Sequence, residues 1–154
     1  SNYSYIPLIL KEIRGSRIIH CYRNPLDNVL SIYRSNFTTG YPYSSSLIDI
    51  AKVLINQHEL MQTYKKLFPN HICSVNYDKL VCEPELEIKK ITTWLNFEWN
   101  ENYLSPHLNL RKVSTTSNVQ VRSPINKKSL LGWENYKVLL KPVIDYFEKQ
   151  KFSY

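Results

Sequence analysis

The sequence is poor in glycine, cysteine and long apolar runs, and each shortage excludes a class of protein. Only three glycines and three cysteines occur among the 154 residues. The cysteines have neither metal-ligand spacing nor a C-x-x-C pair, so they indicate neither a disulfide framework nor a zinc site. Reduced thiols are therefore expected, which favours a cytoplasmic location. No apolar run approaches the roughly 20 residues of a membrane-spanning helix, which predicts a soluble protein without a membrane span.

Basic residues exceed acidic ones, which directs attention to anionic partners. The chain has 20 Lys and Arg against 13 Asp and Glu, a formal net charge of +7. Nucleic acid, nucleotides and membrane surfaces are all compatible with this balance. Hydrophobic residues make up 43% of the chain, enough for a packed core. No repeat, low-complexity tract or linker divides the sequence, so we predict one domain over residues 1–154.

The order of expected elements predicts an α/β fold. Short apolar, β-favouring runs alternate with helical patterns, which indicates a largely parallel sheet flanked by helices. Residues 98–132 are the least regular part of the chain, and Pro142 interrupts the last helical pattern. The expected strands cover residues 17–22, which should be buried, and residues 72–77. One helix is expected to begin at Pro25, and three more are expected at residues 47–68, 84–95 and 133–149.

A possible anion site lies where the first expected strand meets the next helix. Arg23 ends the strand, Asn24 and Pro25 are typical of a helix start, and Ser31 lies two turns into the helix. A guanidinium, the amide donors of a helix N-terminus and a hydroxyl together suit a phosphate. Alternatively, Arg23 pairs with Asp27 at the helix start and Ser31 only occupies a helix face. Spacing alone leaves both interpretations open.

Three segments carry a resemblance to a known family. Residues 17–37, RIIHCYRNPLDNVLSIYRSNF, resemble the 3′-phosphate-binding segment R-N/D-P-x-D-x-x-x-S of sulfotransferases that use 3′-phosphoadenosine 5′-phosphosulfate (PAPS). Residues 75–84, VNYDKLVCEP, resemble the "YEDL" strand end of that family, and residues 114–133, STTSNVQVRSPINKKSLLGW, resemble its late "TAS-x-QVR-x-P…S-x-x-x-W" segment. The likeness is closest to bacterial sulfotransferases related to tyrosylprotein sulfotransferases, which are often fused to tetratricopeptide repeats.

The resemblance implies a fold, a reaction and site residues. It implies a P-loop-NTPase-like fold and transfer of a sulfuryl group from PAPS to a hydroxyl or amine acceptor, which leaves 3′,5′-bisphosphoadenosine and requires no metal. Arg23 and Ser31 would hold the 3′-phosphate, and Tyr77 would lie beside the nucleotide. Ser117 and Arg122 would belong to a loop that closes over the phosphates. Alternatively, Tyr77 packs under the following helix, and the two loop residues lie in water.

One expected motif of the family is missing from the sequence. No turn of the type P-K/R-S/T-G-T-T, which would hold the 5′-phosphosulfate, is present. We therefore expect the chain to be the carboxyl-terminal part of a sulfotransferase domain whose amino-terminal portion is missing. On its own it should lack turnover, and the parent protein would have tetratricopeptide repeats upstream. The sequence assigns no catalytic base and does not name the sulfate acceptor.

Other functions remain open at this point. A nucleic-acid-binding module would explain the charge and the 12 tyrosines. Against it, the basic residues are dispersed, and Tyr33, Tyr64 and Tyr136 fall on apolar helix faces where core packing would explain them. A nucleotide or sugar kinase fragment, or a catalytically inactive nucleotide-binding or interaction domain, would share the α/β fold. A preference for a ligand with a 3′-phosphate would distinguish the sulfotransferase interpretation from these alternatives.

Overall fold

The computed structural model describes residues 2–35, 41–109 and 122–152. Its contacts group the chain into two compact units, which are described separately. The first unit comprises residues 1–18, 23–72 and 130–154, and the second comprises residues 19–22 and 73–129. The single domain expected from the sequence remains a prediction.

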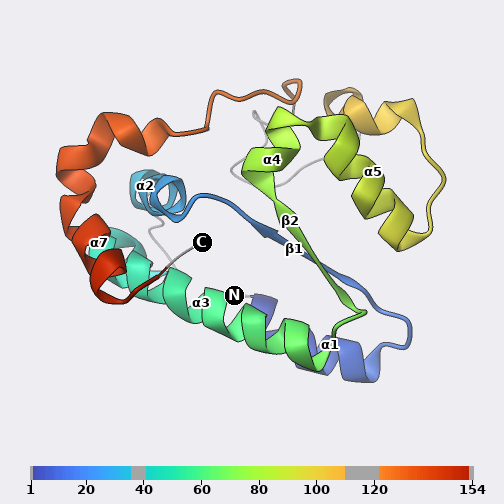
Figure 1. The fold of residues 1–154 in the computed structure, drawn as a ribbon, viewed down its shortest axis with the longest axis horizontal. Coiled ribbons are helices and arrows are strands. Elements are labelled where there is room, and N and C mark those ends of the chain that lie inside the picture. Colours follow the sequence, from blue (N-terminus) through green and yellow to red (C-terminus); the bar gives the residue numbers. More distant parts are fainter. Residues whose placement is uncertain (1, 36–40, 110–121, 153–154) are drawn as a thin grey trace. The chain divides into compact units, whose positions relative to one another are not determined.

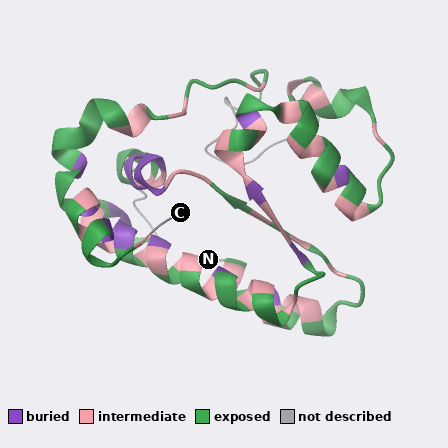
Figure 2. Cartoon of the chain, in the orientation of Figure 1, coloured by how far each residue is buried: buried purple, intermediate pink, exposed green. Residues whose placement is uncertain are grey.

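The first unit is built on three helices that pack around one hydrophobic cluster. These are α2 (Pro25–Ser35), α3 (Leu47–Leu67) and α7 (Lys137–Lys149) (Figure 1). Each helix directs its apolar stripe inward, and the buried positions lie on the facing sides of the helices (Figure 2). The cluster comprises Leu26, Val29 and Leu30 from α2, Ile50, Ala51 and Leu54 from α3, and Leu140, Val143 and Phe147 from α7.

Shorter helices complete the first unit. A 3₁₀ turn at Asn2–Tyr5 leads into α1 (Ile6–Glu12), and Ile6 packs with Met61 and Ile72 in a second, smaller cluster. Further 3₁₀ turns, Pro42–Ser45 and Gly132–Tyr136, precede α3 and α7. The last helix therefore begins at Lys137, four residues later than residue 133 expected from the sequence, and it contains Pro142.

The second unit contains the sheet. The strands β1 (Ile18–Tyr22) and β2 (Ile72–Asn76) form a two-stranded parallel sheet, and their first residues belong to the first unit (Figure 1). The helices α4 (Tyr77–Cys82) and α5 (Pro84–Leu95) follow β2. Two 3₁₀ turns, Glu101–Leu104 and Pro106–Leu108, come next. The chain is thus a mostly helical α/β protein.

Two expectations about burial are wrong. The first strand was expected to be buried, but Ile19 is 42% and Tyr22 38% exposed. A parallel strand is buried on both faces only where helices cover both sides of its sheet, and the described residues form a sheet of only two strands. Core packing was also expected to explain three helical tyrosines, but Tyr33 and Tyr136 are exposed, whereas Tyr64 does pack against the second cluster.

The cysteines and the long helices bear on chemistry and on membrane crossing. All three cysteines have free thiols. Burial raises the pKa of the Cys21 thiol, and the neighbouring Cys73 raises it further, so Cys21 is a poor nucleophile near neutral pH. Among the described residues, no helix combines the length and apolar composition needed to cross a membrane.

Candidate anion-binding site

The start of α2 is capped by the residue that the sequence indicates. The Asn24 side-chain oxygen accepts hydrogen bonds from the backbone N–H of Leu26 at 2.9 Å and of Asp27 at 3.3 Å. Pro25 occupies the first helical position, where its lack of an N–H has no cost. The expectation that these helix-start amides are available to a phosphate is therefore wrong, because the Asn24 cap already occupies two of them. An anion at this position would therefore be held by side chains and by the helix dipole.

Arg23 lies next to this cap and is paired with Asp27. Its Nη2 atom is 3.5 Å from Oδ2 of Asp27, one helical turn away. The ion pair that the alternative interpretation expected is therefore present. The Arg23 side chain is also 20% exposed, so it is not fully buried. The pair restricts the orientation of the guanidinium.

Asp27 has two further partners, far away in the sequence. Its Oδ2 accepts a hydrogen bond from the backbone N–H of Leu131, and its Oδ1 accepts one from Trp133, each at 2.9 Å. The Trp133 side chain packs against the three-helix cluster, and the Lys137 ammonium lies 5.3 Å from its ring centroid. Asp27 thus anchors the turn that leads into α7. This role was not predicted from the sequence, because no local signal indicates it.

Ser31 lies on the same side of α2 as Asp27. The two residues are four positions apart, which places Ser31 about 6 Å further along the helix axis. Ser31 is exposed, and its carbonyl accepts a hydrogen bond from the Ser35 hydroxyl at 2.8 Å. The four-residue spacing therefore places the guanidinium of Arg23 and the hydroxyl of Ser31 along the side of the helix start that carries Asp27. Their part in binding a phosphate remains a prediction.

The other predicted site residues fall in the second unit or outside the described residues. Tyr77 is half-buried at the first position of α4, and its hydroxyl is 3.1 Å from that of Ser129. This contact joins the second and third segments of the family resemblance across 52 residues. The exposed Arg122 donates a hydrogen bond to the Asn109 carbonyl. Ser117 lies outside the described residues.

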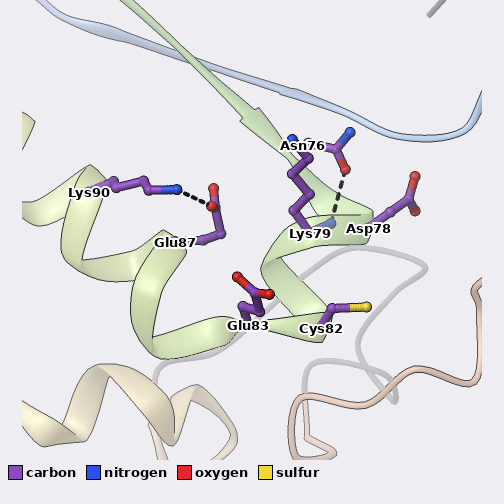
Figure 3. A pocket seen from close by; sticks show the side chains of 7 residues that line it. All are labelled: Asn76, Asp78, Lys79, Cys82, Glu83, Glu87 and Lys90. Atoms are coloured by element: carbon purple, nitrogen blue, oxygen red, sulfur yellow. Dashed lines mark hydrogen bonds and ion pairs between the residues drawn. The ribbon is translucent and has the colours of Figure 1, made fainter.

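A hollow of about 590 Å³ in the second unit contains none of the predicted site residues (Figure 3). Its walls come from the end of β2, from α4 and from the first half of α5, and Lys90 pairs with Glu87 there at 2.5 Å. Within the part of the chain that the structure describes, no group of acidic, histidine or cysteine residues is placed to hold a metal. The hollow is lined by Asn76, Asp78, Lys79, Cys82, Glu83, Glu87 and Lys90.

Comparison with known proteins identifies the class of this α/β chain. A model described as "Sulfotransferase family" matches residues 1–101, about two thirds of the chain. The chain therefore belongs to the sulfotransferase family. The matched region contains the first two segments on which the sequence resemblance rests, at residues 17–37 and 75–84.

A curated relative extends the similarity to nearly the whole chain. It is an uncharacterized protein of Aquifex aeolicus (strain VF5), 31% identical over 151 residues. The alignment covers 96% of this chain but 20% of the relative. The chain thus spans about one fifth of the length of the curated relative that it matches.

Proposed function

We propose that this chain holds the 3′-phosphate half of the donor site in a PAPS-dependent sulfotransferase. Membership of the sulfotransferase family supports sulfuryl transfer in general. The observation that carries the finer proposal is the partly exposed Arg23 side chain, which Asp27 orients where the chain leaves β1. Ser31 supplies a hydroxyl on the same side of the following helix. A planar guanidinium matches the oxygens of a phosphate in a bidentate manner.

The proposed reaction asks little covalent work of the protein. The acceptor oxygen or nitrogen attacks the sulfur, the bond from sulfur to the bridging phosphate oxygen breaks, and the acceptor loses its proton. The protein positions the two reactants and stabilises the negative charge that develops on the leaving 5′-phosphate. Arg23 and Ser31 contribute the positioning, because they fix the nucleotide through a phosphate that does not react.

The remaining predicted residues extend this proposal to the second unit. Tyr77 would lie beside the nucleotide, and Ser117 and Arg122 would belong to a loop over the phosphates. The hydrogen bond between Tyr77 and Ser129 supports a connection between the strand end and the late segment. The sequence contains no 5′-phosphosulfate turn, so we expect this chain alone to bind the nucleotide without turnover. The acceptor is a hydroxyl or an amine, and the proposed subtype is the bacterial, tetratricopeptide-linked one.

The test is calorimetric titration with 3′,5′-bisphosphoadenosine and with AMP, which lacks the 3′-phosphate. The unmodified chain should prefer the bisphosphate. Arg23→Ala should lower bisphosphate affinity tenfold or more, since a charge-assisted hydrogen bond contributes about 1.5–3 kcal/mol, and should leave AMP affinity almost unchanged. Arg34→Ala is the matched control, because Arg34 is an exposed arginine in the last turn of the same helix.

Two other outcomes of the titration would support different functions. Equal affinity for both ligands in a chain that circular dichroism shows to be folded would support an inactive or interaction domain. Binding that falls steeply with salt and is equally weakened by Arg23→Ala and Arg34→Ala would support general attraction of polyanions such as nucleic acid.

A further inference from the structure

We propose that Asp27 is a positioning residue that couples the 3′-phosphate site to the docking of the turn at residues 131–133. The inference rests on the proposed function, because it takes Arg23 to be a phosphate ligand. It adds a role for Asp27 and a mutual dependence between ligand binding and the start of the last helix.

The Asp27 carboxylate contacts both Arg23 and the turn at residues 131–133. Oδ2 of Asp27 faces Arg23 Nη2 at 3.5 Å and accepts the Leu131 N–H at 2.9 Å, while Oδ1 accepts the Trp133 N–H. The Asp27 side chain is only 3% exposed, so water does not readily substitute for these donors. Movement of the turn therefore changes the electrostatic potential that the Asp27 carboxylate produces at Arg23.

The turn depends on Asp27 because its own conformation is unfavourable. Leu131 has φ of 54°, a left-handed conformation that residues with a Cβ atom rarely adopt. Leu131 is 55% exposed, so packing does little to hold it in place. The two hydrogen bonds to Asp27, and that from the Glu134 N–H to the Leu131 carbonyl at 3.0 Å, hold the turn.

The direction of the coupling follows from electrostatics. When the turn is docked, two N–H donors stabilise the Asp27 carboxylate and reduce the negative potential near Arg23. When the turn leaves, the carboxylate competes fully with a phosphate for the guanidinium. A docked turn should therefore strengthen phosphate binding, and by thermodynamic reciprocity a bound phosphate should strengthen docking.

A matched pair of substitutions at Leu131 tests this coupling without changing Arg23 or Asp27. Leu131→Pro removes the N–H that Asp27 accepts and fixes φ near −65°, so the turn cannot dock. Leu131→Gly removes the same exposed side chain but keeps the N–H and tolerates positive φ. We expect Leu131→Pro to lower the preference for 3′,5′-bisphosphoadenosine over AMP at least threefold, and Leu131→Gly to preserve it.

Hydrogen exchange on the unmodified chain provides a second measurement, independent of variant folding. Saturating bisphosphate should slow exchange of the Leu131 and Trp133 amides at least threefold more than AMP does. The Asp49 amide donates a hydrogen bond to the Ser46 hydroxyl at the start of α3 and serves as the internal reference. Its exchange should be slowed equally by the bisphosphate and by AMP.

The outcomes separate this inference from the proposed function. Absence of any bisphosphate preference in the unmodified chain would overturn both. A preference that survives in folded Leu131→Pro, or Leu131 and Trp133 amides that respond equally to both ligands, would overturn the coupling and leave the proposed donor site intact.

Discussion

Asp27 and Asp145 show how strongly the surroundings of one residue determine its role. Each is paired with a basic side chain four residues away on or beside a helix, Asp27 with Arg23 and Asp145 with Lys141. The Asp145 side chain is 55% exposed, whereas that of Asp27 is 3% exposed and accepts two backbone N–H groups. Exposed pairs contribute little to stability, whereas removing a buried acceptor leaves its donors without a partner.

Replacement of these aspartates by alanine should therefore have very different effects. Asp27→Ala should lower the free energy of unfolding by roughly 2–4 kcal/mol, because Arg23 and two backbone N–H groups lose their acceptor. Asp145→Ala should produce little measurable change. Urea denaturation followed by circular dichroism measures both, and equal midpoints for the two variants would contradict the anchoring role of Asp27.

The sequence predicted only the local part of this site. Asn24 was recognised as a helix cap, and the pairing of Arg23 with Asp27 was recognised as an alternative because the two residues are four positions apart. The contacts of Asp27 with Leu131 and Trp133 could not be predicted, because these residues lie 104 and 106 positions further along the chain and no motif links them. The availability of helix-start amides was wrongly expected because the Asn24 side chain competes for the same donors.

Local sequence signals predicted several helix boundaries. Asn24 and Ser46 both accept hydrogen bonds from backbone amides at helix starts, and α5 spans the predicted residues 84–95. The short α4 was not predicted, because Asn76 ends an apolar strand and also caps a helix of only six residues. Strand burial was wrongly predicted because it depends on elements that cover the sheet rather than on the apolar run itself.

The Asn24 cap should contribute measurably to stability. Asn24→Ala should lower the free energy of unfolding by about 1 kcal/mol, since it removes the acceptor for two amides at the start of α2. The matched control is Asn56→Ala at an exposed position inside α3, where the higher helix propensity of alanine predicts a neutral or slightly favourable effect. Thermal unfolding should show the two shifts, and a stabilising effect of Asn24→Ala would contradict the capping geometry.

Two glycines in turns should respond oppositely to alanine. Gly15, after α1, has φ of 76°, so Gly15→Ala should destabilise the fold by about 1 kcal/mol although its added methyl group meets no atom. Gly132 has no such φ, and a methyl group there would lie 3.6 Å from Asp27 Oδ1, an ordinary contact. Gly132→Ala should therefore be neutral or slightly stabilising. Denaturation midpoints that shift equally would show that backbone conformation is not the deciding factor.

The whole chain combines a predictable class with less predictable long-range structure. The alternation of strands and helices predicted an α/β protein, and the family comparison confirms the sulfotransferase family. The grouping into two units was not predicted, because it depends on segments from distant parts of the chain that pack together. The three-helix cluster combines residues 26–30, 50–54 and 140–147 in this way.

The proposed function depends on recognition of a phosphate at the 3′ position through Arg23. The most direct test compares two isomers of equal charge, 3′,5′-bisphosphoadenosine and its 2′,5′ isomer, by titration at several salt concentrations. Recognition through Arg23 predicts tighter binding of the 3′,5′ isomer, a difference that persists at high salt and disappears in Arg23→Ala. Equal affinity for the two isomers in the folded chain would contradict the claim, because only the net positive charge would then be needed to explain binding.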